Sequence, residues 1–203
     1  MYPSTKPDLE FDDKGVCGAC RFREYEKTID WDLRKEEFFE LIEKIRPKNH
    51  SNYDCIIPVS GGKDSTYQLY LIKELAGFNP LLVSFEPSCP TKIGEQNLQN
   101  MVDSFNVDLI QLKKSPTYRK LCRAGFDIVG DNEWANHVGV YCWPMQMAVK
   151  LNIPYTFYGE TRGIIGLGRW DSIVEEKEIP REDVEQFIGM NGLRLTDIID
   201  YDS

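Results

Sequence analysis

The stretch Asp54-Cys55-Ile56-Ile57-Pro58-Val59-Ser60-Gly61-Gly62-Lys63-Asp64-Ser65 decides the fold, because it joins an apolar run to a glycine-rich turn. The run at 54–59 predicts a short buried strand, and Pro58 is placed at its exit because proline has no N–H for a sheet ladder. Beyond the turn, apolar residues at helical spacing from Tyr67 to Leu75 predict an amphipathic helix that ends at Gly77. The stretch therefore predicts a strand, a tight turn and a helix in succession.

The same alternation continues along the chain. Strands are predicted at 80–85, 107–112 and 153–158, and helices at 94–105, 116–123 and 136–151. Another helix, capped by Asp30 or Asp32, is predicted to run to Arg46 before the strand at 54–59, after an extended lead-in at 1–29. Short apolar strands that alternate with helices predict an α/β fold, a parallel sheet with helices on both faces, and a ligand site at the carboxyl ends of the strands.

The glycine-rich turn predicts an anion site. Glycines let the backbone wrap closely, so that amide groups and a helix N-terminus face the anion, and the hydroxyls of Ser60 and Ser65 and the charge of Lys63 add to it. Asp64 would repel a phosphate unless a cation lies between them, so it predicts a bound Mg²⁺. The alternative is a flexible turn capped by Ser65.

Composition and charge narrow the class of protein. The chain has 203 residues and a formal net charge of −9, which is typical of one acidic domain or of one domain with a small appendage. Ten acidic and three basic residues in 171–203 give that segment a net charge of −7, so the remaining 170 residues have a net charge of only −2. Those 170 residues therefore lack the excess of basic charge that is typical of nucleic-acid-binding proteins. No apolar run approaches the ~20 residues of a membrane span and no signal peptide opens the chain, so a cytoplasmic protein is expected.

Of the six cysteines, only Cys17 and Cys20 are spaced as partners. Without a secretion signal, reduced thiols are expected. The pair is compatible with half of a zinc site, with a redox pair and with unliganded thiols, because two thiolates do not complete a four-ligand zinc site.

Ser60-Gly61-Gly62-Lys63-Asp64-Ser65 after an apolar strand resembles the PP-loop of the ATP pyrophosphatases, which cleave ATP to AMP and pyrophosphate. The resemblance implies a Rossmann-like fold of the adenine nucleotide alpha hydrolase type, a three-layer sandwich that binds ATP and Mg²⁺. It implies that the loop holds the pyrophosphate end of ATP, that Val83, Ser84 and Phe85 lie against the adenosine, and that the turn at Gly159 and Glu160 closes over the nucleotide.

Several further segments together resemble the N-acetyl sugar amidotransferases of surface-polysaccharide and nonulosonic acid pathways. They are residues 8–20, 53–57, 137–141, 153–154 and 159–160. The resemblance implies that the substrate is a nucleotide-activated N-acetyl sugar. Its acetamido group becomes an acetamidino group with ammonia from a separate glutaminase subunit. It implies three parts: 1–48 with the cysteine pair and a helix, 49–170 as the ATP-binding domain, and the acidic segment 171–203.

Two residues outside the loop are candidates for catalysis alongside Lys63 and Asp64. His137 begins a predicted helix near the strand ends and would bind the sugar or act as acid or base; the alternative is a structural hydrogen bond at the helix start. Glu160 would orient substrate or metal, and a solvated loop carboxylate is the alternative.

The chain departs from the amidotransferase pattern at both ends. It lacks an earlier Cys-x-x-Cys and stops at Ser203, where family members continue, so it reads as a shortened form. A PP-loop enzyme that modifies tRNA and a nucleotide-binding subunit without catalysis stay as alternatives, and the near-neutral body weighs against tRNA. A homo-oligomer stays open.

Overall fold

The computed structural model describes residues 11–46 and 52–159, which fall into two compact units divided between Ile45 and Arg46. Glu160, which the sequence places in the turn after residues 153–158, and the acidic segment 171–203 lie outside the described residues. The first unit contains helices α1 (Gly18–Glu26) and α2 (Trp31–Ile45). The second unit contains the sheet and the remaining helices.

The helix α2 begins as its sequence predicts. The Asp30 side chain accepts hydrogen bonds from the backbone N–H groups of Asp32 (3.1 Å) and Leu33 (3.0 Å), which have no partner inside the helix. The prediction of an extended lead-in at 1–29 is wrong for α1, because residues 18–26 form a helix that buries Phe22.

The second unit is an α/β fold. Its sheet has the order β1 (Cys55–Pro58), β2 (Pro80–Phe85), β3 (Leu109–Leu112), and both neighbouring pairs are parallel. The helix α3 (Lys63–Tyr70) continues as the π-helix η1 (Leu71–Leu75) and links β1 to β2, while α4 (Lys92–Phe105) links β2 to β3. The predicted α/β class with a parallel sheet is therefore confirmed.

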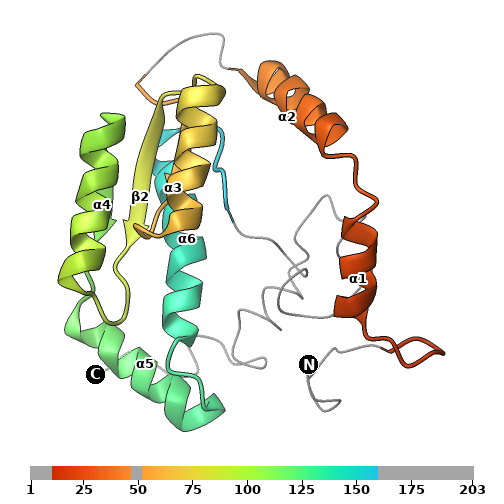
Figure 1. The fold of residues 1–203 in the computed structure, drawn as a ribbon. Coiled ribbons are helices and arrows are strands. Elements are labelled where there is room, and N and C mark those ends of the chain that lie inside the picture. Colours follow the sequence, from red (N-terminus) through yellow and green to blue (C-terminus); the bar gives the residue numbers. More distant parts are fainter. Residues whose placement is uncertain (1–10, 47–51, 160–203) are drawn as a thin grey trace. The chain divides into compact units, whose positions relative to one another are not determined.

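The connections place helices on both faces of the sheet. Right-handed crossovers that advance in one direction, from β1 to β2 to β3, put α3 and α4 on the same face. After β3 the chain forms α5 (Pro116–Val129) and α6 (Trp134–Leu151) and returns beside β1, so α6 covers the opposite face (Figure 1). The core on this face contains Ile56, Leu81, Val83, Met147, Ala148 and Ile153.

The predicted strand at 153–158 is reduced to a single parallel bridge between Ile56 and Thr156. Two hydrogen bonds make this bridge: the Ile56 N–H donates to the Tyr155 carbonyl (2.8 Å) and the Phe157 N–H donates to the Ile56 carbonyl (2.9 Å). Pro154 has no N–H to lengthen the ladder. The segment still lies beside β1, so its end at Gly159 approaches the same sheet edge as the end of β1.

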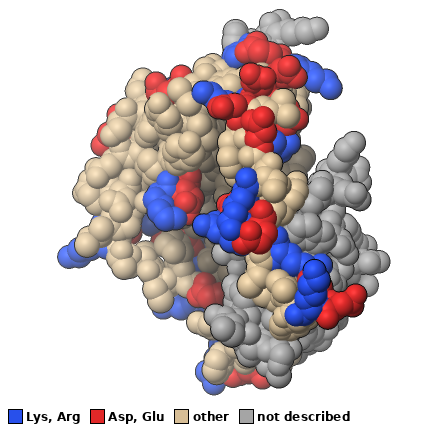
Figure 2. Space-filling model, turned by 45° about the vertical axis from the view of Figure 1, so that its right-hand side comes forward, with Lys and Arg blue, Asp and Glu red and all other residues tan. Residues whose placement is uncertain are grey.

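Charged side chains are mixed on the face that Figure 2 shows, where basic groups lie beside acidic ones. Ion pairs between neighbours on one helix include Lys27 with Glu24 (2.8 Å) and Arg34 with Glu37 (2.6 Å). Exposed pairs of this kind contribute about 0–1 kcal/mol to stability, so they shape the surface potential more than the fold. No described helix is long and apolar enough to cross a membrane.

Candidate functional site

The glycine-rich loop lies where the sequence predicts, between the carboxyl end of β1 and the first turn of α3. Gly62 is the N-cap residue of α3, and Gly61 has a left-handed backbone with φ of +78°. A side-chain Cβ at Gly61 would lie 3.1 Å from both the Gly94 carbonyl oxygen and the Leu98 nitrogen. The loop is thus pressed against the backbone of α4, and only glycine fits there without strain.

Hydroxyl groups fix the shape of the loop. The Ser60 N–H donates to the Ser65 hydroxyl (3.4 Å), which donates to the Gly62 carbonyl (3.1 Å). The Thr66 hydroxyl donates to the same carbonyl (2.9 Å). These bonds hold the turn, while the amides that open α3 have no partner within the helix, as at any helix N-terminus. Such a turn is suited to an anion.

Lys63 and Asp64 project from the first turn of α3 and pair with each other. The Lys63 ammonium lies 2.8 Å from both carboxylate oxygens of Asp64, and the two side chains are 87% and 77% exposed. An exposed pair of neighbours is easily exchanged for other partners. The Lys63 ammonium is therefore accessible to a phosphate, and the Asp64 carboxylate is accessible to a cation.

The residues predicted to lie against the adenosine differ in accessibility. Val83 and Ser84 are each about 1% exposed, so their side chains belong to the core. Phe85 is half-buried at the carboxyl end of β2 and contacts Tyr118 edge-on, with 5.7 Å between the ring centroids. Of the three predicted side chains, only that of Phe85 reaches the edge of the sheet.

A lysine that the sequence analysis missed lies beside Phe85. The Lys114 ammonium is 4.9 Å from the Phe85 ring centroid and 4.0 Å from the Tyr118 ring centroid, and it donates to the Asn136 side chain (2.8 Å). Burial lowers the pKa of this lysine. Its position follows from a signal in the sequence, since Lys114 comes just after β3, and parallel strands end at the same sheet edge.

Glu86 anchors the same edge. Its carboxylate accepts the Lys114 backbone N–H (2.9 Å) and pairs with the Lys113 ammonium (2.9 Å). These two donors hold the pKa of Glu86 below its usual range. The ends of β2 and β3 are thus joined by a charged pair at the rim.

Gly159 and His137 lie at different places around this edge. Gly159 lies against α3, since a Cβ there would be 2.8 Å from the Gln68 side-chain oxygen, and the Gln68 amide donates to the Phe157 carbonyl (2.6 Å). His137 is exposed in the first turn of α6, where its N–H donates to the Glu133 carbonyl (2.9 Å). The neighbouring Asn136 binds Lys114, so this helix end lies next to the loop that follows β3.

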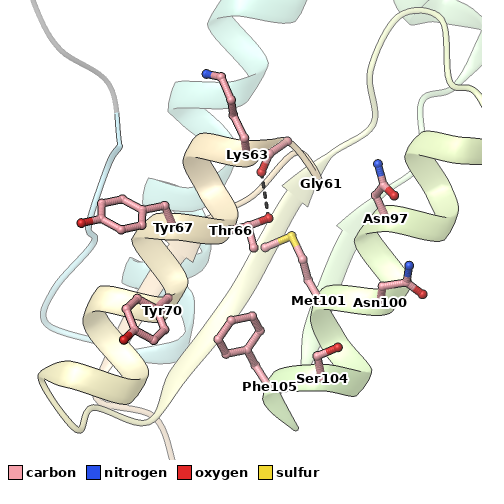
Figure 3. A pocket seen from close by; sticks show the side chains of 11 residues that line it. Gly61, Lys63, Thr66, Tyr67, Tyr70, Asn97, Asn100, Met101, Ser104 and Phe105 are labelled. Carbon is pink, nitrogen blue, oxygen red and sulfur yellow. Dashed lines mark hydrogen bonds between the residues drawn. The ribbon is translucent and has the colours of Figure 1, made fainter.

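A groove of about 690 Å³ starts at the glycine-rich loop and runs between α3 and α4. Met101 and Phe105 reach from α4 toward α3 (Figure 3), and Tyr67 and Tyr70 of α3 also line the groove. Uncharged polar groups of Thr66, Asn97, Asn100 and Ser104 complete the lining. Lys63 is the charged residue of this lining, at the loop end.

The prediction of a zinc site gains no support. Among the residues that the structure describes, no group of three or more histidine, cysteine, aspartate or glutamate side chains could hold a metal ion. Cys17 and Cys20 are free thiols. A site with these two ligands alone would lack half of the usual four.

Comparison with known proteins gives limited matches. No protein-family model matches the sequence. A stretch of 113 residues, 56% of this chain, is 30% identical to the uncharacterized protein MJ1599 of Methanocaldococcus jannaschii and covers 40% of it. The chain thus spans less than half the length of that relative. The NH3-dependent NAD synthetase from Campylobacter jejuni, solved with nitrate ion, has a TM-score of 0.44 and 16% identity, covering 63% of this chain and 56% of that one.

Proposed function

We propose that the chain is an ATP-using enzyme of the PP-loop class that transfers AMP to the amide oxygen of an N-acetyl sugar, so that ammonia can replace it. The observation that carries the ATP-binding part is the Gly61–Gly62 turn, held against α4 at the end of β1 and opening α3. The sugar and the ammonia source, a separate glutaminase subunit, rest on the sequence resemblance.

An amide needs activation before ammonia can displace its oxygen. The amide oxygen attacks the α-phosphorus and pyrophosphate leaves; ammonia then attacks the amide carbon and AMP leaves, which gives the amidine. In this proposal the loop amides, Ser60 and Ser65 bind the pyrophosphate end, and Lys63 offsets its charge. Asp64 would hold Mg²⁺, which supplies further neutralisation of phosphate charge. No covalent nucleophile of the protein is required.

The chemistry of the groove supports binding of the uncharged sugar ring of the acceptor. It adjoins the loop, and its amide and hydroxyl groups, which include Asn97 and Ser104, carry no charge. A volume of about 690 Å³ lies within the range of small-molecule sites, ~300–1,000 Å³. A sugar ring offers hydroxyl groups that match such donors and acceptors.

The function is tested by measuring AMP and pyrophosphate from ATP, Mg²⁺ and ammonium with a nucleotide-linked N-acetyl sugar. Release that depends on the sugar is expected, and the matched sugar with a free amino group in place of the acetamido group should give none. Release that requires tRNA would favour the tRNA-modifying alternative, which the near-neutral charge of residues 1–170 weighs against. ATP binding without turnover under all conditions would favour a nucleotide-binding subunit.

Asp64→Asn is expected to weaken binding of Mg²⁺-ATP by about tenfold, because it removes the charge that would hold the cation, and tenfold corresponds to ~1.4 kcal/mol. Binding of ATP in the presence of a chelator should change little, since the loop amides are untouched. Isothermal titration calorimetry with and without Mg²⁺ measures both.

Asp127→Asn is the matched control for this prediction. Asp127 is also exposed and also pairs with a cation of its own helix, Arg123, at 3.6 Å. Its substitution should leave Mg²⁺-ATP binding unchanged. Equal affinities of wild type and Asp64→Asn for Mg²⁺-ATP would show that Asp64 does not hold the cation.

A further inference from the structure

Cys17 and Cys20 face each other across the first turn of α1. Cys17 is the N-cap residue, with an extended backbone (φ −72°, ψ 156°), and Cys20 is the third residue of the helix. The side chains of these two positions meet across the turn, as they do in a capping box. Both thiols are free, Cys17 is partly exposed and Cys20 is exposed. The pair is therefore close and open to reagents.

The segment before α1 holds Cys17 in place. Cys17 forms an antiparallel bridge with Phe11, and the turn between them is closed by the Asp12 carboxylate, which accepts the N–H groups of Lys14 (2.9 Å) and Val16 (2.8 Å). On the other side, the Arg21 N–H donates to the Cys17 carbonyl (3.0 Å). The backbone of Cys17 is thus fixed by hydrogen bonds from both sides.

The surroundings of the two sulfurs differ. The pKa of Cys17 lies below its ordinary value, because the Cys20 amide, the Cys20 thiol and the Ala19 amide lie toward the Cys17 sulfur. The Cys17 side chain does not form an N-cap hydrogen bond with the helix. The hydrogen bond to Cys17 and the charge of that sulfur raise the pKa of Cys20. The two pKa shifts have opposite directions, so Cys17 is the more easily deprotonated of the two thiols, which is the asymmetry of a reactive dithiol.

We propose that Cys17 and Cys20 form a redox-active dithiol that closes reversibly into an intramolecular disulfide by exchange with a small disulfide. The Cys17 thiolate attacks one sulfur of the small disulfide, which breaks that bond, forms a mixed disulfide and releases one thiolate. Cys20 loses its proton to solvent, and its thiolate attacks the Cys17 sulfur and expels the second thiolate. Two protein thiols are oxidised and one small disulfide is reduced to two thiols, so the electrons balance.

The exchange is tested on the full chain in buffers with increasing ratios of oxidised to reduced glutathione. Free thiols are alkylated and the protein is digested with trypsin, which places both cysteines in the peptide 15–21. The expected result is that this peptide changes from doubly alkylated to unalkylated and two hydrogens lighter, without a partly alkylated plateau, and that dithiothreitol reverses the change.

Two variants keep the inference falsifiable. Cys17→Ser should prevent the closed form and leave Cys20 alkylated or bound to glutathione. Cys142→Ser, which removes an exposed cysteine of α6, should leave the behaviour of the peptide unchanged. The inference is overturned if peptide 15–21 stays doubly alkylated at every ratio, if each cysteine carries glutathione at equilibrium, or if the purified protein holds stoichiometric zinc that must be chelated before any oxidation occurs.

Discussion

Gly61→Ala is expected to weaken ATP binding by at least about tenfold, or ~1.4 kcal/mol. The new Cβ would lie 3.1 Å from two backbone atoms of α4, and φ at this position is +78°. The left-handed backbone alone costs an L-residue ~1–2 kcal/mol, and backbone atoms of a packed helix cannot move aside as a side-chain tip can. The loop would have to leave its place at the end of β1, which would move its amides out of register with the phosphates. Calorimetric titration with ATP measures the change.

Gly130→Ala is the matched control for backbone strain. Gly130 ends α5 with φ of +75°, but nothing lies within 4 Å of a Cβ built there. It should cost stability in thermal unfolding and leave ATP binding unchanged. Equal losses of ATP affinity in both variants would mean that Gly61 matters for stability and not for the shape of the loop.

Gly139→Ala is expected to lower the free energy of unfolding by about 1–3 kcal/mol. A Cβ at Gly139 would lie 2.2 Å from the Phe85 ring, so the ring would have to swing away. It would then lose its contacts with Lys114 and Tyr118, which join the ends of β2 and β3 to α5. Chemical denaturation measures the loss.

A double-mutant cycle isolates the clash. In a Phe85→Ala background the Phe85 ring is absent, so a Cβ at residue 139 meets no clash with it. Adding Gly139→Ala should then lower the free energy of unfolding by only a few tenths of a kcal/mol, as for nearly independent sites. If Gly139→Ala costs as much in that background as in the wild type, the contact with Phe85 is not the cause.

The layers of the fold could be predicted because hydrophobic periodicity acts over whole elements. Buried strands such as β1 and β2 are uninterrupted apolar runs, and the apolar stripe of α4 recurs at helical spacing, so both patterns are local. The boundaries agree within a few residues for these elements.

Two local features were mispredicted for identifiable reasons. The α1 segment contains glycine and polar residues and follows a cysteine, so its composition is typical of a loop. In the structure this segment is a helix that buries Phe22, and its composition does not show that burial. Residues 153–158 have strong strand propensity, but within the described residues they pair with β1 alone, and Pro154 cannot donate. Propensity does not report how many partners an edge segment finds.

The glycine-rich loop could be found from sequence because six consecutive residues carry it. The sequence places Lys114 just after β3, but it does not show the contacts of Lys114 with Phe85 and Asn136, which are distant in the chain and meet it only in the folded sheet. The burial of Val83 and Ser84 is similarly a property of the packed sheet. A site formed by the ends of several strands can be predicted only when the order of the strands in the sheet is known.

The bridge between Ile56 and Thr156 bears on how the chain folds during synthesis. On the ribosome, β1, α3 and β2 emerge early and can pair, but the outer edge of β1 stays open until residues 155–157 have been made. During that interval an unpaired strand edge is exposed next to the nascent glycine-rich loop, and such edges are prone to pair with other chains. A ligand that binds the loop is therefore expected to stabilise the nascent chain only after residues 155–157 have paired with the open edge of β1.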